Sequence, residues 1–206
     1  MRGRFVTLEG GEGVGKSTQL RRLAETLRQT GREVVETREP GGSEGAEAIR
    51  GLLMTGTVGR WTARAEALLF AAARADHLDK TILPALARGA WVVCDRFIDS
   101  SRAYQGGADG LGDAEILALH AIGSEGLMPD RTLLLTLPVL EGASRAFDRD
   151  NGRGDRFGER GAEYHARVAR AFQSLAEADP DRFRIIDASG TPEEVTTRLL
   201  AALGGL

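Results

Sequence analysis

Short runs of apolar residues recur along the chain at intervals that leave room for a helix between each pair. The runs are four to six residues long and centred on Val, Ile, Leu or Phe, and this length and composition predict β-strands. The run at 90–94 is continuously apolar, which is typical of a strand at the centre of a parallel sheet. The predicted strands lie at residues 5–8, 33–36, 90–94, 132–137 and 183–186.

Between these runs the apolar residues recur at helical spacing. After the first strand, Leu20 and Leu23 fall on one helix face, and Gly31 follows the helix as a stop signal. Near the end of the chain, Thr191 and Glu194 have the spacing of a capping box, which predicts the start of a closing helix. The predicted helices span residues 17–28, 46–54, 62–83, 113–123, 140–147, 159–178 and 192–203.

Proline, glycine and polar residues mark the breaks between these elements. Residues 38–42 and 105–112 are predicted loops because of their Pro and Gly content, and residues 148–154 form a polar break. Pro84 is expected to kink or end the long helix that precedes it. Asp113 is expected to cap the next helix through its side-chain oxygen.

Strands and helices therefore alternate from one end of the chain to the other. The sequence shows neither an internal repeat nor a segment with the composition of an interdomain linker. This order predicts a single α/β domain over residues 1–206, in which helices cover both faces of a five-stranded parallel sheet.

Composition and charge narrow the classes of function. The 206 residues carry a net charge of −3, with an estimated pI of 5.7, which argues against a general nucleic-acid-binding protein. No apolar run approaches the ~18 residues of a membrane span, and no signal peptide opens the chain. Cys94 is the single cysteine, which fits a reducing cytoplasm. With only three scattered histidines beside it, the sequence predicts no metal cluster of Cys and His ligands. Lysine occurs only at Lys16 and Lys80, so nearly all positive charge is arginine.

The turn after the first predicted strand carries a complete phosphate-binding motif, Gly10-x-x-x-x-Gly15-Lys16-Ser17. Glycines let backbone N–H groups converge on phosphate oxygens, and the positive end of the following helix adds to their effect. In such a motif the lysine reaches the β and γ phosphates and the hydroxyl is a Mg²⁺ ligand. The expected binding residues for the phosphates of a nucleoside triphosphate are Gly10, Gly11, Glu12, Gly13, Val14, Gly15, Lys16, Ser17 and Thr18.

A charged pair, Asp95-Arg96, directly follows the third predicted strand. In an open α/β sheet, ligands bind at the carboxyl ends of the strands, so this pair is a candidate for the same site. The alternative is an ion pair at the surface with little effect on stability.

Four segments in the same order resemble thymidylate kinase, which phosphorylates dTMP to dTDP. The most specific is Asp-Arg-Phe-Ile-Asp-Ser-Ser-Arg-Ala-Tyr-Gln-Gly at 95–106; the others lie at 5–18, 37–42 and 69–77. The resemblance implies a three-layer P-loop domain with a mobile lid over about 145–160. It further implies ATP as phosphate donor, Mg²⁺, dTMP as acceptor and a homodimer that binds neither nucleic acid nor membrane.

The resemblance also assigns roles by position. Phe70 is similar to the ring that stacks on thymine, Arg74 to the arginine that donates to a thymine carbonyl, and Arg96 to the arginine that holds the acceptor phosphate. Without it, Phe70 and Arg74 would suggest a core residue beside a solvated arginine. Asp95 is expected to orient Arg96 or the magnesium waters. The remaining acceptor contacts implied are Glu12, Ser101, Tyr104 and Gln105, with Glu39 and Arg50 as weaker candidates.

Five arginines lie between residues 145 and 160, and they are candidates for the positive charge that assists phosphoryl transfer. Such chemistry relies on positioning and neutralisation of charge. The phosphate loop has Gly13 where some family members carry an arginine, so the lid is expected to supply one, as in the bacterial type. Arg153 and Arg156 are the predicted catalytic residues of this segment, beside Lys16 and Arg96. The sequence departs from the family pattern at Gly158 and Ala73, two positions where relatives often carry an acidic residue.

Two other classes of function stay open at this level. One is a kinase for another nucleotide monophosphate or a deoxynucleoside, and the other is a nucleotide-dependent switch or partition protein without an acceptor. A GTPase switch would be expected to carry an Asn-Lys-x-Asp motif, which the sequence lacks.

Overall fold

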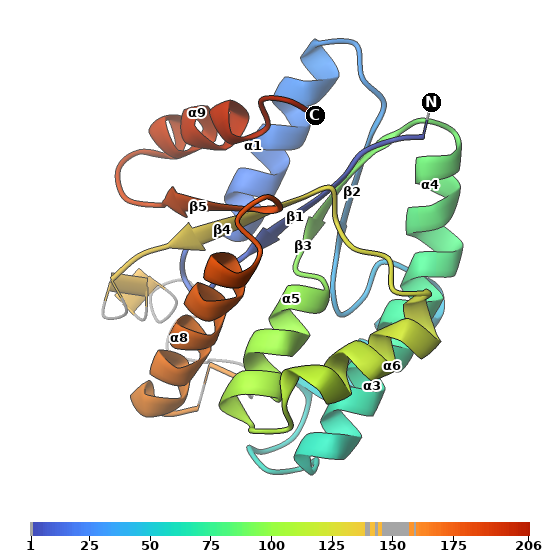
Figure 1. The fold of residues 1–206 in the computed structure, drawn as a ribbon, viewed down its shortest axis with the longest axis vertical. Helices are drawn as coiled ribbons and strands as arrows, with labels where there is room; N and C mark the ends of the chain where they lie inside the picture. Colours follow the sequence, from blue (N-terminus) through green and yellow to red (C-terminus); the bar gives the residue numbers. More distant parts are fainter. Residues whose placement is uncertain (1, 139–140, 143, 146–156, 159) are drawn as a thin grey trace.

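The structure is a computed structural model that describes residues 2–138, 141–142, 144–145, 157–158 and 160–206. Its centre is a sheet of five parallel strands in the order β2-β3-β1-β4-β5 (Figure 1). The strands are β1 (Phe5–Glu9), β2 (Val34–Arg38), β3 (Trp91–Asp95), β4 (Arg131–Thr136) and β5 (Phe183–Asp187).

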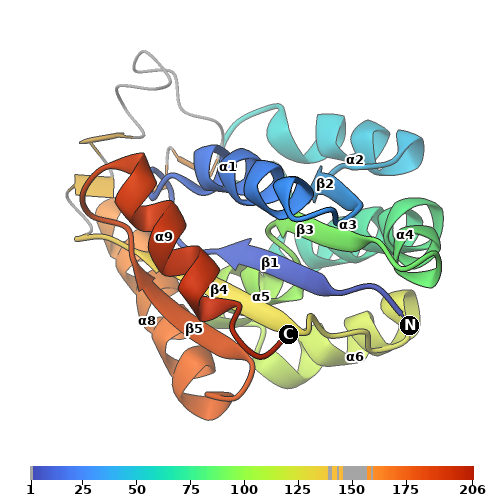
Figure 2. The ribbon, with the colours of Figure 1, turned by 90° about the horizontal axis from the view of Figure 1, so that it is seen from above.

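Helices cover both faces of this sheet, as the alternation of elements predicts. On one face lie α1 (Lys16–Gln29) and α9 (Pro192–Ala202), which stand in front of the strands when the molecule is seen from above (Figure 2). The other face is covered by α3 (Ala63–His77), α5 (Ile98–Ser101), α6 (Asp113–Ser124) and α8 (Ala162–Ala178) (Figure 1). The helix α2 (Glu44–Met54) packs beside α3. The predicted α/β fold with its five strands is confirmed.

The alternation of side chains along the strands divides the core into two layers. Val6 and Leu8 of β1 join the apolar cluster under α1 and α9, whereas Phe5 joins the cluster under α3 and α6. Val92 and Cys94 of β3 belong to this second cluster as well. Because successive residues of a strand point to opposite faces, the three central strands β1, β3 and β4 are mostly buried and apolar. The edge strands β2 and β5 also carry polar, partly exposed residues.

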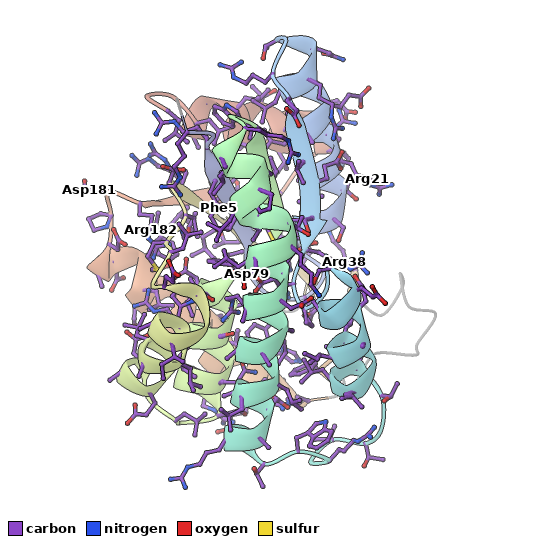
Figure 3. The ribbon with its side chains drawn as sticks, turned by 90° about the vertical axis from the view of Figure 1, so that its right-hand side faces the viewer. Phe5, Arg21, Arg38, Asp79, Asp181 and Arg182 are labelled. Carbon is purple, nitrogen blue, oxygen red and sulfur yellow. The ribbon has the colours of Figure 1, made fainter. Side chains whose placement is uncertain are left out.

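The long helix predicted at 62–83 continues past Pro84. Figure 3 shows α3, a π-helical segment η1 (Leu78–Ile82) and α4 (Leu83–Ala87) as one continuous rod. Pro84 stands in the first turn of α4, directly after the widened turn. Of the two effects expected of Pro84, an end of the helix is therefore excluded, because the helical segments follow one another without a break.

Two smaller predictions are wrong. Residues 105–108, expected in a loop, belong to a second π-helical segment, η2 (Arg102–Ala108), because the chain continues the turn begun by α5. Asp113 does not cap α6: the capping position is Gly112, and the Asp113 carboxylate instead accepts two hydrogen bonds from Arg102. The helix predicted at 159–178 begins at Ala162, and β2 extends through Arg38. Of the helix predicted at 140–147, the described residues 141, 142, 144 and 145 are helical.

None of the helices in the described part of the chain is long and apolar enough to cross a membrane. Within the same residues, no group of three or more His, Cys, Asp and Glu side chains has the arrangement of a metal site.

Candidate active site

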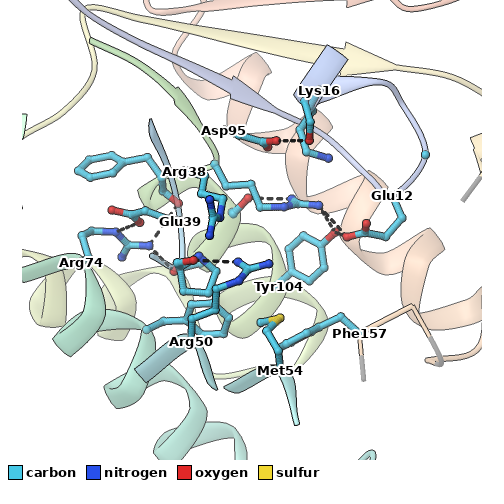
Figure 4. A pocket seen from close by; sticks show the side chains of 18 of the residues that line it. Glu12, Lys16, Arg38, Glu39, Arg50, Met54, Arg74, Asp95, Tyr104 and Phe157 are labelled. Carbon is cyan, nitrogen blue, oxygen red and sulfur yellow. Dashed lines mark hydrogen bonds and ion pairs between the residues drawn. The ribbon is translucent and has the colours of Figure 1, made fainter. Parts of the chain in front are cut away.

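A cavity of about 380 Å³ opens at the carboxyl ends of β1, β2 and β3. This is the edge of an open α/β sheet at which ligands bind. The cavity is lined by the phosphate loop on one side and by α2, α3 and η2 on the other (Figure 4). Every residue predicted to contact the acceptor lies on its wall: Glu12, Glu39, Arg50, Phe70, Arg74, Asp95, Arg96, Ser101, Tyr104 and Gln105.

The phosphate loop has the backbone geometry that its motif predicts. Gly13 and Gly15 have φ angles of 71° and 89°, which favour glycine over residues with a Cβ. α1 begins directly after, at Lys16, and no side chain caps its first N–H groups. These N–H groups and the positive end of the helix therefore face the cavity, where an anion would satisfy them.

Lys16 is buried in this loop. Its Nζ donates to the carbonyl oxygen of Gly11 at 2.6 Å and to that of Gly10 at 3.2 Å. Burial and the positive charge of Arg96 lower the pKa of Lys16 to about 8, against the attraction of Glu12. The ammonium is thus held by weak neutral acceptors, and a phosphate group would stabilise its charged form.

The predicted metal ligands, Ser17 and Asp95, converge although 78 positions separate them. Ser17 Oγ donates to Asp95 Oδ2 at 2.8 Å, so a hydroxyl and a carboxylate oxygen meet at the phosphate end of the cavity. Mg²⁺ prefers oxygen ligands and takes only a few from the protein, so this pair fits the ion.

Arg96 stands between the phosphate loop and the acceptor side. Its φ angle of 69° lies in the left-handed region, and its guanidinium donates to Gly10 O at 3.0 Å and to Glu12 Oε1 at 2.7 Å. It also lies over the ring of Tyr104, whose OH accepts from Nη2 at 3.3 Å. Burial alone would lower the pKa of Arg96, but Tyr104, Glu12 and Asp95 together hold it above its ordinary value. Asp95 was expected to orient this arginine or the magnesium waters; the direct carboxylate contact to Arg96 comes from Glu12, and Asp95 pairs with Ser17.

A carboxyl group that the sequence analysis did not single out supports Arg96 from behind. Glu9, the last residue of β1, is fully buried; it accepts from Phe97 N at 2.8 Å and from Ser100 Oγ at 2.5 Å. Ser100 in turn accepts from Arg96 Nη1 at 3.0 Å. Glu9 therefore fixes both the backbone after Arg96 and one partner of its guanidinium. A carboxylate at the end of an otherwise apolar strand is the signal that could have revealed it.

The other end of the cavity is more apolar. Phe70 is half-buried on α3, and its ring packs edge-on against Phe157 at 5.8 Å between centroids. Met54 lies on the same side of the cavity as Phe157, and neither was a sequence candidate (Figure 4). These side chains form an apolar wall of the kind that receives a planar ring.

Arg74 and Glu39 lie face to face beside this wall (Figure 4). Arg74 Nε donates to Glu39 Oε2 at 2.8 Å, and Nη2 donates to Ser101 Oγ at 2.8 Å. Both side chains of the ion pair are only 4% exposed. Arg50, for which a solvated position was an alternative, lines the cavity and donates to Pro40 O at 2.8 Å.

Of the five arginines at 145–160, two lie in the described part of the chain. Arg145 is exposed, lines the cavity and pairs with Glu141 at 2.6 Å. Arg160 is engaged elsewhere: its guanidinium contacts Glu66 at 3.1 Å and Asp109 at 2.7 Å. The positions of Arg149, Arg153 and Arg156 lie outside the described residues, so the predicted catalytic role of Arg153 and Arg156 stays a prediction.

Comparison with known proteins identifies the family. The sequence model of the thymidylate kinase family matches residues 8–199. The chain is 62% identical to the thymidylate kinase of Rhizorhabdus wittichii, covering 100% of this chain and 99% of that protein.

The chain belongs to the thymidylate kinase family. The family resemblance predicted from sequence is thereby confirmed, as is its class of activity, a nucleotide phosphotransferase.

Other members of the thymidylate kinase family agree in sequence and fold. The thymidylate kinase of Gluconobacter oxydans is 51% identical over 98% of this chain and 94% of its own length. The crystal structure of thymidylate kinase from Ehrlichia chaffeensis superimposes with a TM-score of 0.78 at 30% identity, covering 98% of this chain and 99% of that one.

Proposed function

We propose that this member of the thymidylate kinase family transfers the γ-phosphate of ATP to the 5′-phosphate of dTMP, giving ADP and dTDP. The observation that carries the proposal is one continuous cavity that joins a phosphate loop to an apolar wall with a buried arginine. An acceptor-binding wall of this kind is what a phosphotransferase needs, and a nucleotide switch or partition protein has no use for it.

Each end of the cavity suits one substrate. The phosphate loop and Lys16 bind the phosphates of ATP, while Phe70 and Phe157 enclose the base of dTMP and Arg74 donates to a base carbonyl. Arg96 lies between the two ends and holds the acceptor phosphate, for which its forked guanidinium is suited. Tyr104 and Glu12, both in contact with Arg96, face the sugar.

Ser17, with Asp95 directly or through water, would hold Mg²⁺, which when bound supplies positive charge to the phosphate oxygens. The protein's own contribution is to position the two phosphates and to keep positive charge at the point of transfer. Lys16 and Arg96 provide that charge in the described residues, and we propose that Arg153 or Arg156 adds to it.

A coupled assay of ADP release with a panel of acceptors tests the proposal. We expect dTMP to give the highest kcat/KM among dTMP, dUMP, dCMP, dGMP and AMP, with formation of dTDP confirmed by chromatography. Lys16→Ala serves as the background control. A higher kcat/KM for dCMP or dGMP, or ADP release that does not depend on any acceptor, would contradict the proposed reaction.

We also propose that the protein acts as a homodimer in the cytoplasm. The two most exposed large apolar side chains of the described residues, Ile122 at 85% and Leu68 at 56%, lie on the adjacent helices α6 and α3. Large apolar groups exposed on neighbouring helices favour a protein partner. Sedimentation should give a dimer for the wild type and a monomer for Ile122→Glu; a monomeric wild type would contradict the proposal.

A further inference from the structure

A chain of polar side chains, half-buried at Thr37 and buried beyond it, runs behind the base end of the cavity. Thr37 Oγ1 lies 2.6 Å from His77 Nε2, and His77 Nδ1 lies 3.1 Å from Glu39 Oε1. The other oxygen of Glu39 accepts from Arg74, which also donates to Ser101. The chain therefore begins on β2 and ends on the wall of the cavity.

The bonds determine the proton on the His77 ring. Glu39 faces a guanidinium, and a carboxylate can only accept hydrogen bonds, so His77 must carry a proton on Nδ1 and donate it to Oε1. On the other side of the ring, Nε2 pairs with the hydroxyl of Thr37. Each carboxylate oxygen of Glu39 thus has its own donor, and Glu39 can turn only if both bonds break.

This arrangement controls the direction of Arg74. The bond from Nε to Glu39 and the bonds from Nη2 to Ser101 Oγ and Phe97 O fix the plane of the guanidinium. Among the described residues, Arg74 Nη1 has no hydrogen-bond partner, and Arg74 lines the cavity. Glu39 therefore determines the direction in which the remaining N–H donors of Arg74 point. His77 in turn holds Glu39 in position.

Close packing holds the His77 ring in place. The ring is 0% exposed, and Gly42 of the loop after β2 lies so near that an added Cβ would overlap His77 Nε2 and Thr37 Oγ1. Thr81 Oγ1 ties the same loop down by donating to Gly42 O at 2.7 Å. An imidazole that only filled space would not need a buried carboxylate beside it, since burying a charge is unfavourable unless it is paired.

We propose that His77 is a positioning residue for the acceptor base: by donating to Glu39 it fixes the carboxylate that orients Arg74 toward the base. The inference rests on the proposed function, in which Arg74 contacts the base of dTMP. It changes the role of Glu39, which acts through Arg74 and is not itself a substrate contact.

Two substitutions of His77 distinguish this positioning role from a structural one, because each variant keeps the hydrogen-bonding atom of only one ring nitrogen. The amide of an asparagine takes the place of Nδ1, so His77→Asn keeps a donor for Glu39. The longer His77→Gln takes the place of Nε2 and keeps only the partner of Thr37. We expect His77→Gln to raise the KM for dTMP by roughly tenfold, the scale of one hydrogen bond to a charged group. His77→Asn should stay within about threefold of the wild type, and the KM for ATP should be unchanged in both.

Thermal melting of both variants reports the structural effect of losing the ring, which should be similar in the two. Equal KM values for dTMP in His77→Gln and His77→Asn, or a KM for ATP that rises in parallel, would overturn the proposal. Wild-type turnover of dTMP is measured first, because its absence would contradict the proposed function and not the role of His77.

A double-mutant cycle with Arg74 tests the route of the effect. In an Arg74→Lys background the guanidinium plane no longer exists, so the additional effect of His77→Gln on the KM for dTMP should fall below about twofold. If the effect keeps its full size in that background, His77 does not act through Arg74. Thr37→Val provides a second variant: it leaves the donor to Glu39 in place and should leave the KM for dTMP near the wild-type value.

Discussion

Glu9 predicts an unusual dependence of stability on pH. Burial, and then the charge of Asp99, raise the pKa of this carboxyl from 4.5 to about 8, although Ser100, Arg96 and Phe97 N favour its charged form. Lys16 and Tyr104 also face it across the site. Between these two pKa values the folded protein holds a proton that the unfolded chain has released. The free energy of unfolding therefore decreases as pH rises through this window and levels off above it.

The size of the effect follows from the pKa difference. A shift from 4.5 to about 8 corresponds to roughly 5 kcal/mol in total, or about 1.4 kcal/mol for each pH unit inside the window. Glu9→Gln has nearly the shape of the protonated carboxyl and does not titrate. Its amide keeps an oxygen for Phe97 N and a polar group beside Ser100.

Urea unfolding of the wild type and Glu9→Gln between pH 5 and pH 9 measures this difference directly. The two proteins should be about equally stable at pH 5, and the variant should gain several kcal/mol relative to the wild type by pH 8. Glu25→Gln, on an exposed position of α1, is the matched control for loss of a carboxylate without burial. A difference between wild type and Glu9→Gln that stays constant over this range would refute the reasoning.

Three further predictions concern the phosphate loop, the base wall and the loop after β2. The pKa of Lys16 is about 8 without ligand, and a bound phosphate should restore its charge. Calorimetry in buffers of different ionisation enthalpy should therefore show proton uptake on ATP binding at pH 9 and almost none at pH 7. Equal proton uptake at the two pH values would contradict this prediction. Phe70→Ala should raise the KM for dTMP roughly tenfold and leave that for ATP within about twofold, since base stacking on a ring is worth about 1–3 kcal/mol; equal effects on both substrates would contradict a stacking role. Gly42 and Gly59 have similar φ angles of 86° and 84°, but a Cβ meets the His77 ring only at Gly42. Gly42→Ala should therefore lower the free energy of unfolding by about 1–3 kcal/mol more than Gly59→Ala, and equal losses by urea unfolding would count against the crowding.

The parts of the fold that sequence predicts well are those decided by neighbouring residues. The five strands and the phosphate loop follow from apolar runs and glycine spacing within windows of about ten residues, so each pattern could be recognised locally. The capping box of Thr191 and Glu194 is formed as predicted. The sequence did not decide whether the helix continues past Pro84, because a π-helical turn depends on packing along the whole rod, which leaves no local pattern.

The candidate site also has a part that the sequence predicts and a part that it does not. Resemblance located the residues of the cavity wall, but the partners behind that wall come from distant positions. Arg96 contacts Glu12 across 84 positions of sequence, and His77 contacts Glu39 across 38. In the sequence, Glu9 only follows a predicted strand and His77 only lies within a predicted helix. Their roles depend on the sheet order, which brings β1, β2 and β3 together.

Two buried carboxyl groups, Glu39 and Glu9, each support an arginine on the wall of the cavity. Glu39 holds Arg74 directly, and Glu9 acts on Arg96 through Ser100. The ion pair of Arg74 and Glu39 contributes little to stability, because the desolvation of a buried ion pair offsets most of its attraction. What both arrangements provide is direction, since a planar guanidinium fixed at one edge presents its other edge in a single orientation. A lysine could carry the same charge but not that direction. The preference for arginine in this chain therefore has a structural basis at the two positions where base and phosphate are expected to bind.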